Sequence, residues 1–315
     1  MVAAFAQGQI YRQMKVLITG SGGMLGTDLA LKLASKYEVA GVGRRPVSHL
    51  RIPYHTVNLS NSKTTLEFIL DLKPEAILHA AAMTEVDLCE TERRAALEEN
   101  LETTRHVTDA ANRLKALVIY FSTDFVFDGQ KSGPYTEEDV PHPLSVYGQT
   151  KLLAEKYLRL RGRRYFILRT SWLFGAYGNN FPKKILKQAE AGKALKVVSD
   201  ETGNPTYTVD LAGAVEEILR QIQEGASKKE NQILNAANEG TVSRYEFAKA
   251  VLKRRNFPES LVSPVSRTDV HYPAARPANS TLATEKIMNY FGIRLRPWQD
   301  ALAAYLQEET AELPQ

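Results

Sequence analysis

The stretch KVLITGSGGMLG, from Lys15 to Gly26, joins an apolar run directly to a glycine-rich turn. The apolar residues after it recur at helical spacing, so the order is strand, turn and helix, as in folds that bind a dinucleotide. In such a turn Gly20 permits the tight bend, Gly23 lets the backbone approach a pyrophosphate, and Gly26 lets the helix pack closely on the strand. The stretch therefore predicts a dinucleotide-binding fold.

The helix that follows the turn is expected to hold the phosphates of this cofactor. Its first N–H groups have no partners within the helix, and its dipole adds positive potential at that end. The residues predicted to contact the cofactor here are Gly20, Gly22, Gly23, Met24, Leu25 and Gly26.

The next apolar run, from Val39 to Gly43, ends in Arg44 and Arg45. A unit selective for NAD usually has a carboxylate near this point to accept the ribose 2′-hydroxyl, whereas a guanidinium suits the 2′-phosphate of NADP. We therefore predict that Arg44 and Arg45 favour NADPH over NADH. The alternative interpretation is that the two arginines only solvate a loop.

Short apolar runs and helical patterns alternate along the first two thirds of the chain. Strands are expected around Val57 and over 76–79, 117–122 and 165–169, and helices over 63–72, 89–114 and 146–160. This alternation predicts an α/β fold, a doubly wound parallel sheet of the Rossmann type covered by helices on both faces. A smaller carboxyl-terminal α+β lobe is expected to bind the substrate.

The length of 315 residues is about twice that of a typical domain, which favours one large domain with a smaller companion. We expect residues 14–172 to form the dinucleotide-binding domain, with a segment from about 208 to 238 returning to it. Residues 173–207 and 239–315 would form the substrate-binding lobe. Residues 1–13 are interpreted as a flexible leader that precedes Met14.

Composition and charge favour a cytoplasmic enzyme. The formal net charge of +4 suits an anionic ligand such as a nucleotide but gives no case for a nucleic-acid partner. Cys89 is the single cysteine, so no disulfide can form within the chain, which suits a reducing compartment. No stretch is long and apolar enough to cross a bilayer, and residues 1–13 lack the apolar core of a signal peptide, so no membrane partner is expected.

Tyr147 and Lys151 stand four residues apart, a spacing that puts both side chains on one face of a helix. An ammonium beside a phenol favours the phenolate and lowers a tyrosine pKa that otherwise lies near 10, so that the tyrosine can exchange a proton at neutral pH. The spacing alone is weak evidence, because it occurs three times, at Tyr11 and Lys15, Tyr147 and Lys151, and Tyr245 and Lys249.

Chain order selects one of these pairs. Ligands of open parallel sheets bind beyond the carboxyl ends of the strands, and Thr123 follows one such end directly. The helix with Tyr147 begins one loop later, whereas Tyr11 precedes the fold and Tyr245 lies on a late helix. We therefore predict that Thr123, Tyr147 and Lys151 catalyse a carbonyl reduction.

Eight motifs in order give the chain a resemblance to a known family. They are TGSGGMLG at 19–26, HAAAMTEVD at 79–87, STDFVFDG at 122–129, YGQTKLLAE at 147–155, RTSWLFG at 169–175, GNNF at 178–181, GNPT at 203–206 and RPANSTL at 276–282. With them, nearly the whole chain resembles the extended short-chain dehydrogenase/reductases and, within that family, the dTDP-4-dehydrorhamnose reductases.

The resemblance implies NADPH-dependent reduction of the C4 keto group of dTDP-4-dehydro-L-rhamnose to dTDP-L-rhamnose, with NADH left open as a second cofactor. Tyr147 would give a proton to the developing C4 alkoxide. Lys151 would lower the tyrosine pKa and hold the nicotinamide ribose, and Thr123 would hydrogen-bond the reacting oxygen.

The resemblance also implies further contacts to both ligands. The expected cofactor contacts are Asn58, Leu59, Ala80, Ala81 and Ala82, together with Tyr147 and Lys151. The expected substrate contacts are Thr84, Val86, Thr123, Asp124, Trp172, Asn180 and Arg276. Arg276 is the candidate for the charge contact, because a guanidinium can fork onto a phosphate.

Some of these residues have plain structural interpretations as well. Trp172 would then belong to the core, Thr84 to a turn, Asn180 to a helix cap and Arg276 to a loop. Other positions depart from the family pattern. Asn58 stands where an aspartate is frequent, Glu201 where a glutamine is common, and Met83 replaces an aromatic residue or a histidine. These changes could shift which sugar is accepted.

Related enzymes leave alternatives for the function. Sugar-nucleotide dehydratases resemble this chain but have a glutamate after the threonine and aspartate, whereas Phe125 follows Asp124 here, so dehydration lacks a base. Another nucleotide-sugar 4-reductase stays open, as does a 4-epimerase, which keeps NAD bound. A non-catalytic role, like that of the similar regulatory subunit of methionine adenosyltransferase, stays open too.

The sequence says less about metal binding and oligomeric assembly than about the cofactor and the catalytic residues. The six histidines form no pair at metal-binding intervals, so no metal site is predicted. Some members of the resembling family hold magnesium at a dimer interface, which is not predicted here. The sequence does not determine the oligomeric state, and a homodimer is left open because dimers are common on general grounds.

Overall fold

The computed structural model describes residues 13–225 and 230–310. Its main feature is a sheet of seven strands in the order β11-β6-β5-β4-β1-β2-β3, in which every neighbouring pair is parallel. The predicted doubly wound parallel sheet is therefore confirmed. The strands are β1 (Lys15–Thr19), β2 (Glu38–Gly43), β3 (Tyr54–Thr56), β4 (Ala76–His79), β5 (Leu117–Thr123), β6 (Tyr165–Thr170) and β11 (Gln232–Asn235).

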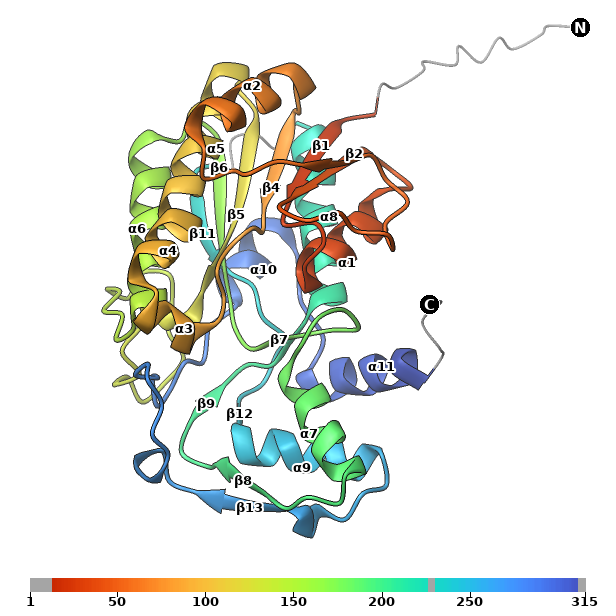
Figure 1. Cartoon of the computed structure of the whole chain (residues 1–315), viewed down its shortest axis with the longest axis vertical. Helices are drawn as coiled ribbons and strands as arrows, with labels where there is room; N and C mark the ends of the chain where they lie inside the picture. Colours follow the sequence, from red (N-terminus) through yellow and green to blue (C-terminus); the bar gives the residue numbers. More distant parts are fainter. Residues whose placement is uncertain (1–12, 226–229, 311–315) are drawn as a thin grey trace, which may run out of the picture.

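Helices cover both faces of this sheet (Figure 1). On one face α1 packs against α8, with α10 beside them, and on the other α5 packs between α2 and α6. Their bounds are α1 (Met24–Leu33), α2 (Ser62–Leu72), α5 (Thr103–Leu114), α6 (Val146–Arg161), α8 (Thr208–Gln223) and α10 (Glu285–Phe291).

The central strands β1, β4, β5 and β6 are almost entirely buried, as their continuous apolar runs predict. Side chains of a strand point alternately to the two faces, so Val16 and Ile18 join the core under α1 and α8, while Leu17 joins the core under α2, α5 and α6. All three residues are fully buried. The main core thus consists of two apolar layers, one on each face of the sheet.

The strand order reverses beside β1, which pairs with β2 on one side and with β4 on the other. The connections that leave the carboxyl ends of β1 and β4 therefore diverge, and a crevice opens between them. The carboxyl ends of β5 and β6 lie at the same edge, because all these strands are parallel. This edge is where a ligand of such a sheet is expected.

A second core lies below the sheet in Figure 1 and is rich in aromatic residues. Phe174 contacts the rings of Tyr207, Phe247 and Tyr305, and each ring buries a large apolar area. The elements around it are β7 (Leu173–Phe174), β8 (Leu195–Val198), β9 (Thr202–Gly203), β10 (Thr206–Tyr207), β12 (Val242–Ser243), β13 (Val262–Val265), α7 (Phe181–Glu190), α9 (Arg244–Arg254) and α11 (Trp298–Thr310).

The helix expected over 89–114 is interrupted. It consists of α3 (Val86–Thr91), α4 (Arg93–Leu97), a π-helical turn over Glu98–Glu102, and α5. The Asn100 side chain in the turn accepts a hydrogen bond from the Met83 amide (2.8 Å) and donates to the Thr150 hydroxyl (2.9 Å). These bonds tie the turn to α6 and to the loop after β4, an example of a π-turn near a functional site.

The predicted return of residues 208–238 to the sheet agrees with the packing of α8 and with the pairing of β11 and β6. The domain boundaries themselves stay a prediction. The predicted leader, residues 1–13, lies outside the described residues except for Gln13. Over the described ranges, no helix has the length and apolarity needed to span a membrane.

Candidate active site

A pocket opens at the carboxyl ends of β1, β2, β4, β5 and β6, where the sheet meets the second core. It brings together most of the residues predicted from the sequence. Those that line it are Gly20, Gly23, Met24, Leu25, Gly26, Arg44, Asn58, Leu59, Ala80, Ala81, Ala82, Thr84, Val86, Thr123, Asp124, Tyr147, Lys151, Trp172 and Arg276.

The glycine-rich turn has the backbone that the sequence predicts. Gly20 has a φ of 67°, and a Cβ there would lie 2.8 Å from the Cα of Ala81. A Cβ on Gly26 would collide with the carbonyl oxygen of Gly20. Gly23 precedes α1 as an N-cap without a side-chain hydrogen bond, and the first turn carries no acidic residue. The start of α1 therefore leaves room and free N–H groups for a pyrophosphate.

The loop after β4 is held against this turn by Thr19 at the end of β1. The Thr19 hydroxyl accepts a hydrogen bond from the Ala81 amide (3.1 Å) and is 2.7 Å from Nδ1 of His79. The other ring nitrogen of His79 is 3.1 Å from the Thr104 hydroxyl. A buried polar chain thus fixes the two loops between which the cofactor is expected.

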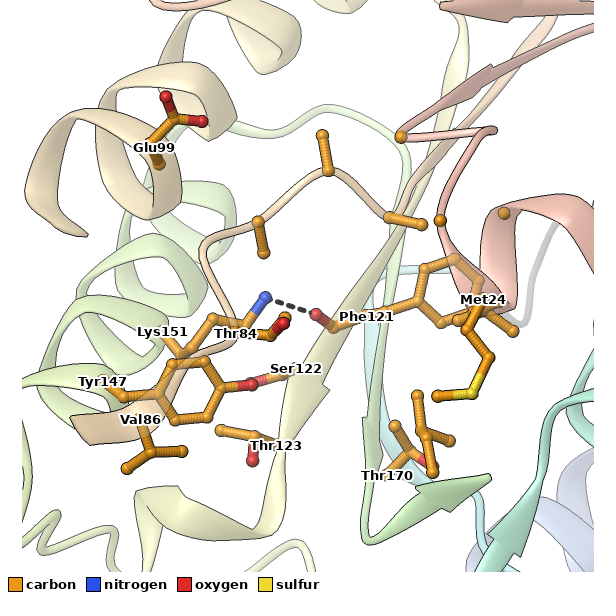
Figure 2. Close-up of a pocket in the computed structure, with 18 of the residues that line it drawn as sticks. Met24, Thr84, Val86, Glu99, Phe121, Ser122, Thr123, Tyr147, Lys151 and Thr170 are labelled. Carbon is orange, nitrogen blue, oxygen red and sulfur yellow. Dashed lines mark hydrogen bonds between the residues drawn. The ribbon is translucent and has the colours of Figure 1, made fainter. Parts of the chain in front are cut away.

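Tyr147 and Lys151 project from the first two turns of α6, which begins after the N-cap Ser145. Figure 2 shows them beside Thr123 on one side of the pocket, with Met24 on the other. Lys151 is buried, and its Nζ donates a hydrogen bond to the carbonyl oxygen of Phe121 (2.6 Å), at 4.2 Å from the ring centroid of Tyr120. These contacts hold the lysine head at the pocket wall.

The expected lowering of the tyrosine pKa is wrong for this structure. Burial raises the pKa of Tyr147, and a hydrogen bond with Thr123 opposes this only in part. Burial also lowers the pKa of Lys151 to about 7, against the effect of the Glu155 carboxylate. Desolvation disfavours the charged form of both groups and is the largest cause of both shifts. Tyr147 is accordingly a protonated phenol, ready to act as an acid.

Thr123 and Asp124 lie at the end of β5, next to the tyrosine. The Thr123 hydroxyl donates to Oδ1 of Asp124 (3.0 Å) and accepts from the Phe125 amide (3.2 Å). Burial raises the pKa of Asp124 to about 6. The Phe125 ring meets the Tyr147 ring edge-on, with centroids 5.9 Å apart. An apolar ring therefore stands at the position from which a dehydratase would need a carboxylate.

The second described pair, Tyr245 and Lys249, does not line the pocket. Lys249 makes ion pairs with Glu246 (3.7 Å) and Glu259 (3.3 Å) on the outer side of α9, 5.5 Å from the ring centroid of Tyr245. Tyr11 lies outside the described residues. Among the described pairs, position alone therefore singles out Tyr147 and Lys151.

Arg44 reaches the pocket, whereas Arg45 does not line it. The Arg44 guanidinium forms an ion pair with Glu99, a pocket residue of the π-helical turn that the sequence did not indicate. Arg45 uses its carbonyl oxygen to accept a hydrogen bond from the Tyr54 hydroxyl (2.7 Å). Only one of the two predicted arginines is thus placed to select a cofactor.

Asn180 and Gly22 also lie outside the pocket lining. The Asn180 side chain caps α7, accepting from the Lys183 amide (3.0 Å) and donating to the Gly175 carbonyl (2.7 Å). The plain interpretation of Asn180 as a cap therefore describes its contacts, and Asn179 lines the pocket instead. Sequence alone could not separate two adjacent asparagines.

Arg276 lies in the pocket, but its guanidinium is already engaged. It donates to Asp87 (2.8 Å) and to the Ala274 carbonyl (2.9 Å), and lies 3.7 Å from the ring centroid of Tyr272. Another arginine lines the same side of the pocket and was missed. This is Arg244, stacked over Trp172 with 3.5 Å between its Cζ and the ring centroid.

Trp172 is both packed and strained. It packs against the second core, as the core interpretation expects, and it also lines the pocket, while its contact with a substrate stays a prediction. Its φ of 47° lies in the left-handed region, which is uncommon for a bulky side chain and is often found at functional sites. The further lining residues missed by the sequence are Gly43, Val57, Ser60, Glu99, Thr103, Phe121, Ser122, Phe125, Thr170, Ser171, Leu173, Asn179 and Arg244. Most directly follow a predicted strand end or adjoin a predicted site residue, which is the signal that could have found them.

No group of three or more His, Cys, Asp or Glu side chains in the described ranges is arranged to hold a metal ion.

Comparisons with known proteins point in one direction. A family model described as RmlD substrate binding domain matches residues 14–311. A dTDP-4-dehydrorhamnose reductase of Aggregatibacter actinomycetemcomitans is 38% identical over 91% of this chain and 97% of its own length. The spore coat polysaccharide biosynthesis protein SpsK of Bacillus subtilis is 34% identical over 94% and 98%. A crystal structure of dTDP-4-dehydrorhamnose reductase from Bacillus anthracis in complex with NADP superposes with a TM-score of 0.84, at 29% identity, covering 94% of this chain and 99% of that one.

Proposed function

The chain belongs to the family of the RmlD substrate binding domain, and we propose that it is an NADPH-dependent reductase of the C4 keto group of dTDP-4-dehydro-L-rhamnose. The product would be dTDP-L-rhamnose, a nucleotide sugar for polysaccharide synthesis. The names of the similar proteins supply the substrate, and the bound NADP of the Bacillus anthracis structure supports the cofactor.

One observation carries this proposal. Thr123, Tyr147 and Lys151 line the same pocket as the loop from Gly20 to Gly26. This supports the proposal, because a carbonyl reduction needs a proton donor and a dinucleotide within one cavity.

The residues fit the roles that the chemistry needs. The bound nicotinamide would supply a hydride to the C4 carbon and become oxidised, while the ketone becomes an alcohol. Tyr147 would give its phenolic proton to the C4 oxygen as negative charge develops there, and Thr123 would hydrogen-bond the same oxygen. Charged Lys151 would stabilise the phenolate that remains. A tyrosine that burial keeps protonated is suited to this direction of transfer.

The cofactor site supports NADPH in two places. The free N–H groups at the start of α1 suit the pyrophosphate, and Arg44 at the end of β2 suits a 2′-phosphate. Asn58, Leu59, Ala80, Ala81 and Ala82 line the pocket between these two points. Magnesium has no assigned role in this proposal.

The proposal extends to the setting of the enzyme. We propose a cytoplasmic enzyme with a nucleotide-sugar substrate and no nucleic-acid or membrane partner, acting as a homodimer. The division at about residue 172, with residues 208–238 returning to the sheet, is proposed as its domain organisation.

An assay of NADPH oxidation tests the function. Wild-type protein should oxidise NADPH with dTDP-4-dehydro-L-rhamnose, and Tyr147→Phe should lower kcat by about 10²- to 10⁴-fold, because the proton donor is lost. Tyr245→Phe is a matched control, since Tyr245 has the same spacing to a lysine but lies outside the pocket. Activity only with another nucleotide-linked keto sugar would show that the proposed substrate is wrong. Tightly bound NAD in the purified protein would favour an epimerase, and folded protein that binds cofactor without turnover would favour a regulatory role.

A further inference from the structure

Arg244 is the first residue of α9 and lines the same pocket as the glycine-rich turn. Its guanidinium lies 3.5 Å from the ring centroid of Trp172 and 5.3 Å from that of Phe181. A guanidinium stacked on an aromatic ring keeps its N–H donors in its own plane, where they stay available to a ligand.

The other cationic groups of the pocket are already engaged. Arg44 pairs with Glu99, Arg276 pairs with Asp87, and Lys151 donates to the Phe121 carbonyl. For the Arg244 guanidinium, no hydrogen bond or ion pair is found within residues 13–225 and 230–310. A charged group with five N–H donors therefore lines the pocket without a side-chain hydrogen bond to a protein acceptor in the described residues.

The position of Arg244 is unfavourable unless an anion binds. A cation at the start of a helix opposes the helix dipole, because that end carries partial positive charge. Burial lowers the pKa of Arg244 to about 10, against the effects of the Glu201 and Asp124 carboxylates, so the group is still charged at neutral pH. A partly buried charge without a hydrogen-bonded partner in the described residues is costly, and the molecule retains it here.

The Trp172 ring, on which Arg244 stacks, is itself closely packed. The Trp172 ring packs on Gly203, where a Cβ would lie 2.7 Å from Cε2 of the indole. The amide of Arg244 donates to the Glu201 carbonyl (3.1 Å), and the amide of Thr206 donates to the Trp172 carbonyl (3.2 Å). The backbones of Arg244 and Trp172 are therefore tied to the segments at β9 and β10, which holds the stacked pair in the lobe.

We propose that Arg244, rather than Arg276, binds the diphosphate of the nucleotide-sugar substrate, while Trp172 supports it from beneath. This inference rests on the proposed function, because the diphosphate is the anionic part of the proposed substrate. Arg276 instead stabilises the lining of the pocket by its ion pair with Asp87 and its stacking on the Tyr272 ring. The diphosphate of the dinucleotide is a separate ligand, since its expected site is the start of α1.

The test compares Arg244→Met and Arg244→Lys with the control Arg267→Met. Arg267 is an exposed arginine of the same lobe that does not line the pocket. Calorimetry with thymidine 5′-diphosphate, thymidine and NADPH measures each affinity separately. Arg244→Met should lower the affinity for thymidine 5′-diphosphate by about 10- to 100-fold, because charge-assisted hydrogen bonds to the diphosphate are lost. Thymidine and NADPH should bind as to the wild type. Arg244→Lys should lie between, because it keeps the charge without the fork.

Several results would overturn the inference. The first is an equal affinity of Arg244→Met and wild type for thymidine 5′-diphosphate. The second is an equal loss of affinity for thymidine in Arg244→Met. The third is the same loss of affinity for thymidine 5′-diphosphate in Arg267→Met. A wild-type protein that does not bind thymidine 5′-diphosphate would overturn it as well. NADPH affinity reports whether the variants are folded. Turnover of the keto sugar by wild type tests the proposed function independently, so an active enzyme whose Arg244→Met variant binds the diphosphate normally would reject only this inference.

Discussion

Arg44 and Glu99 form an ion pair at the edge of the pocket, between the end of β2 and the π-helical turn before α5. The Glu99 side chain is 19% exposed and that of Arg44 is 65% exposed, so the carboxylate is the more buried partner. A carboxylate here would repel a 2′-phosphate, and it can also accept a hydrogen bond from a ribose 2′-hydroxyl. We therefore expect Glu99 to work against the NADPH preference proposed for Arg44.

Glu99→Gln should strengthen the preference for NADPH. The change removes the repelling charge and releases Arg44, so the ratio of kcat/KM for NADPH to that for NADH should rise about tenfold, equivalent to 1.4 kcal/mol. Steady-state kinetics with both cofactors measures the ratio. Glu102→Gln is the matched control, because Glu102 lies on the same turn but pairs with Arg105 on the surface. An unchanged ratio in Glu99→Gln would show that the carboxylate does not act on the cofactor.

Gly26→Ala should abolish cofactor binding, whereas the matched control Gly213→Ala should stabilise the protein. The added Cβ would collide with the Gly20 carbonyl and force the glycine-rich turn apart. Gly213 lies within α8, where an added methyl group would meet open space, so Gly213→Ala should raise the free energy of unfolding by about 0.5–1 kcal/mol. NADPH titration and urea unfolding of both variants measure these effects. Normal NADPH affinity in Gly26→Ala would remove the turn from the cofactor site.

Asp124→Asn should stabilise the protein at pH 8. The folded pKa of Asp124 is raised from 3.8 to about 6, so the folded state binds more protons than the unfolded state between these values, and stability falls as pH rises through that window. Above it, the buried carboxylate costs about 3 kcal/mol, which an amide does not. In urea unfolding, the free energy of unfolding of Asp124→Asn should therefore exceed that of the wild type by a large amount at pH 8 and by a small amount at pH 4. An equal gain at both pH values would contradict the assigned titration.

The parts of the molecule that the sequence predicted are those that periodicity and glycine spacing determine. The strand and helix around Gly20 to Gly26 follow from apolar spacing and from the backbone that glycine permits, and the family resemblance read from the motifs is confirmed by the family match. Thr123 and Tyr147 could be paired before the structure, because parallel strands bring their carboxyl ends to one edge.

The missed residues depend on long-range contacts that leave no local pattern. Arg244 begins a helix about 70 residues after Trp172, and nothing near either residue in the sequence indicates the stacking. Glu99 faces Arg44 only because the π-helical turn interrupts the expected helix. The pKa of Tyr147 was predicted in the wrong direction, because spacing shows proximity to Lys151 but not how deeply both groups are buried.

Catalysis should weaken above about pH 7 as Lys151 loses its proton. Burial lowers the pKa of this lysine to about 7, and only its charged form stabilises the phenolate left after proton transfer, so kcat/KM should fall towards tenfold per pH unit above that value. Tyr147 does not cause the decline, because its own pKa is raised. Lys151→Met should lower the activity and remove the decline, and pH profiles of the two proteins measure this. A decline that persists in Lys151→Met would assign the titration to another group, whereas a flat profile at reduced activity would leave the lysine charge as the cause.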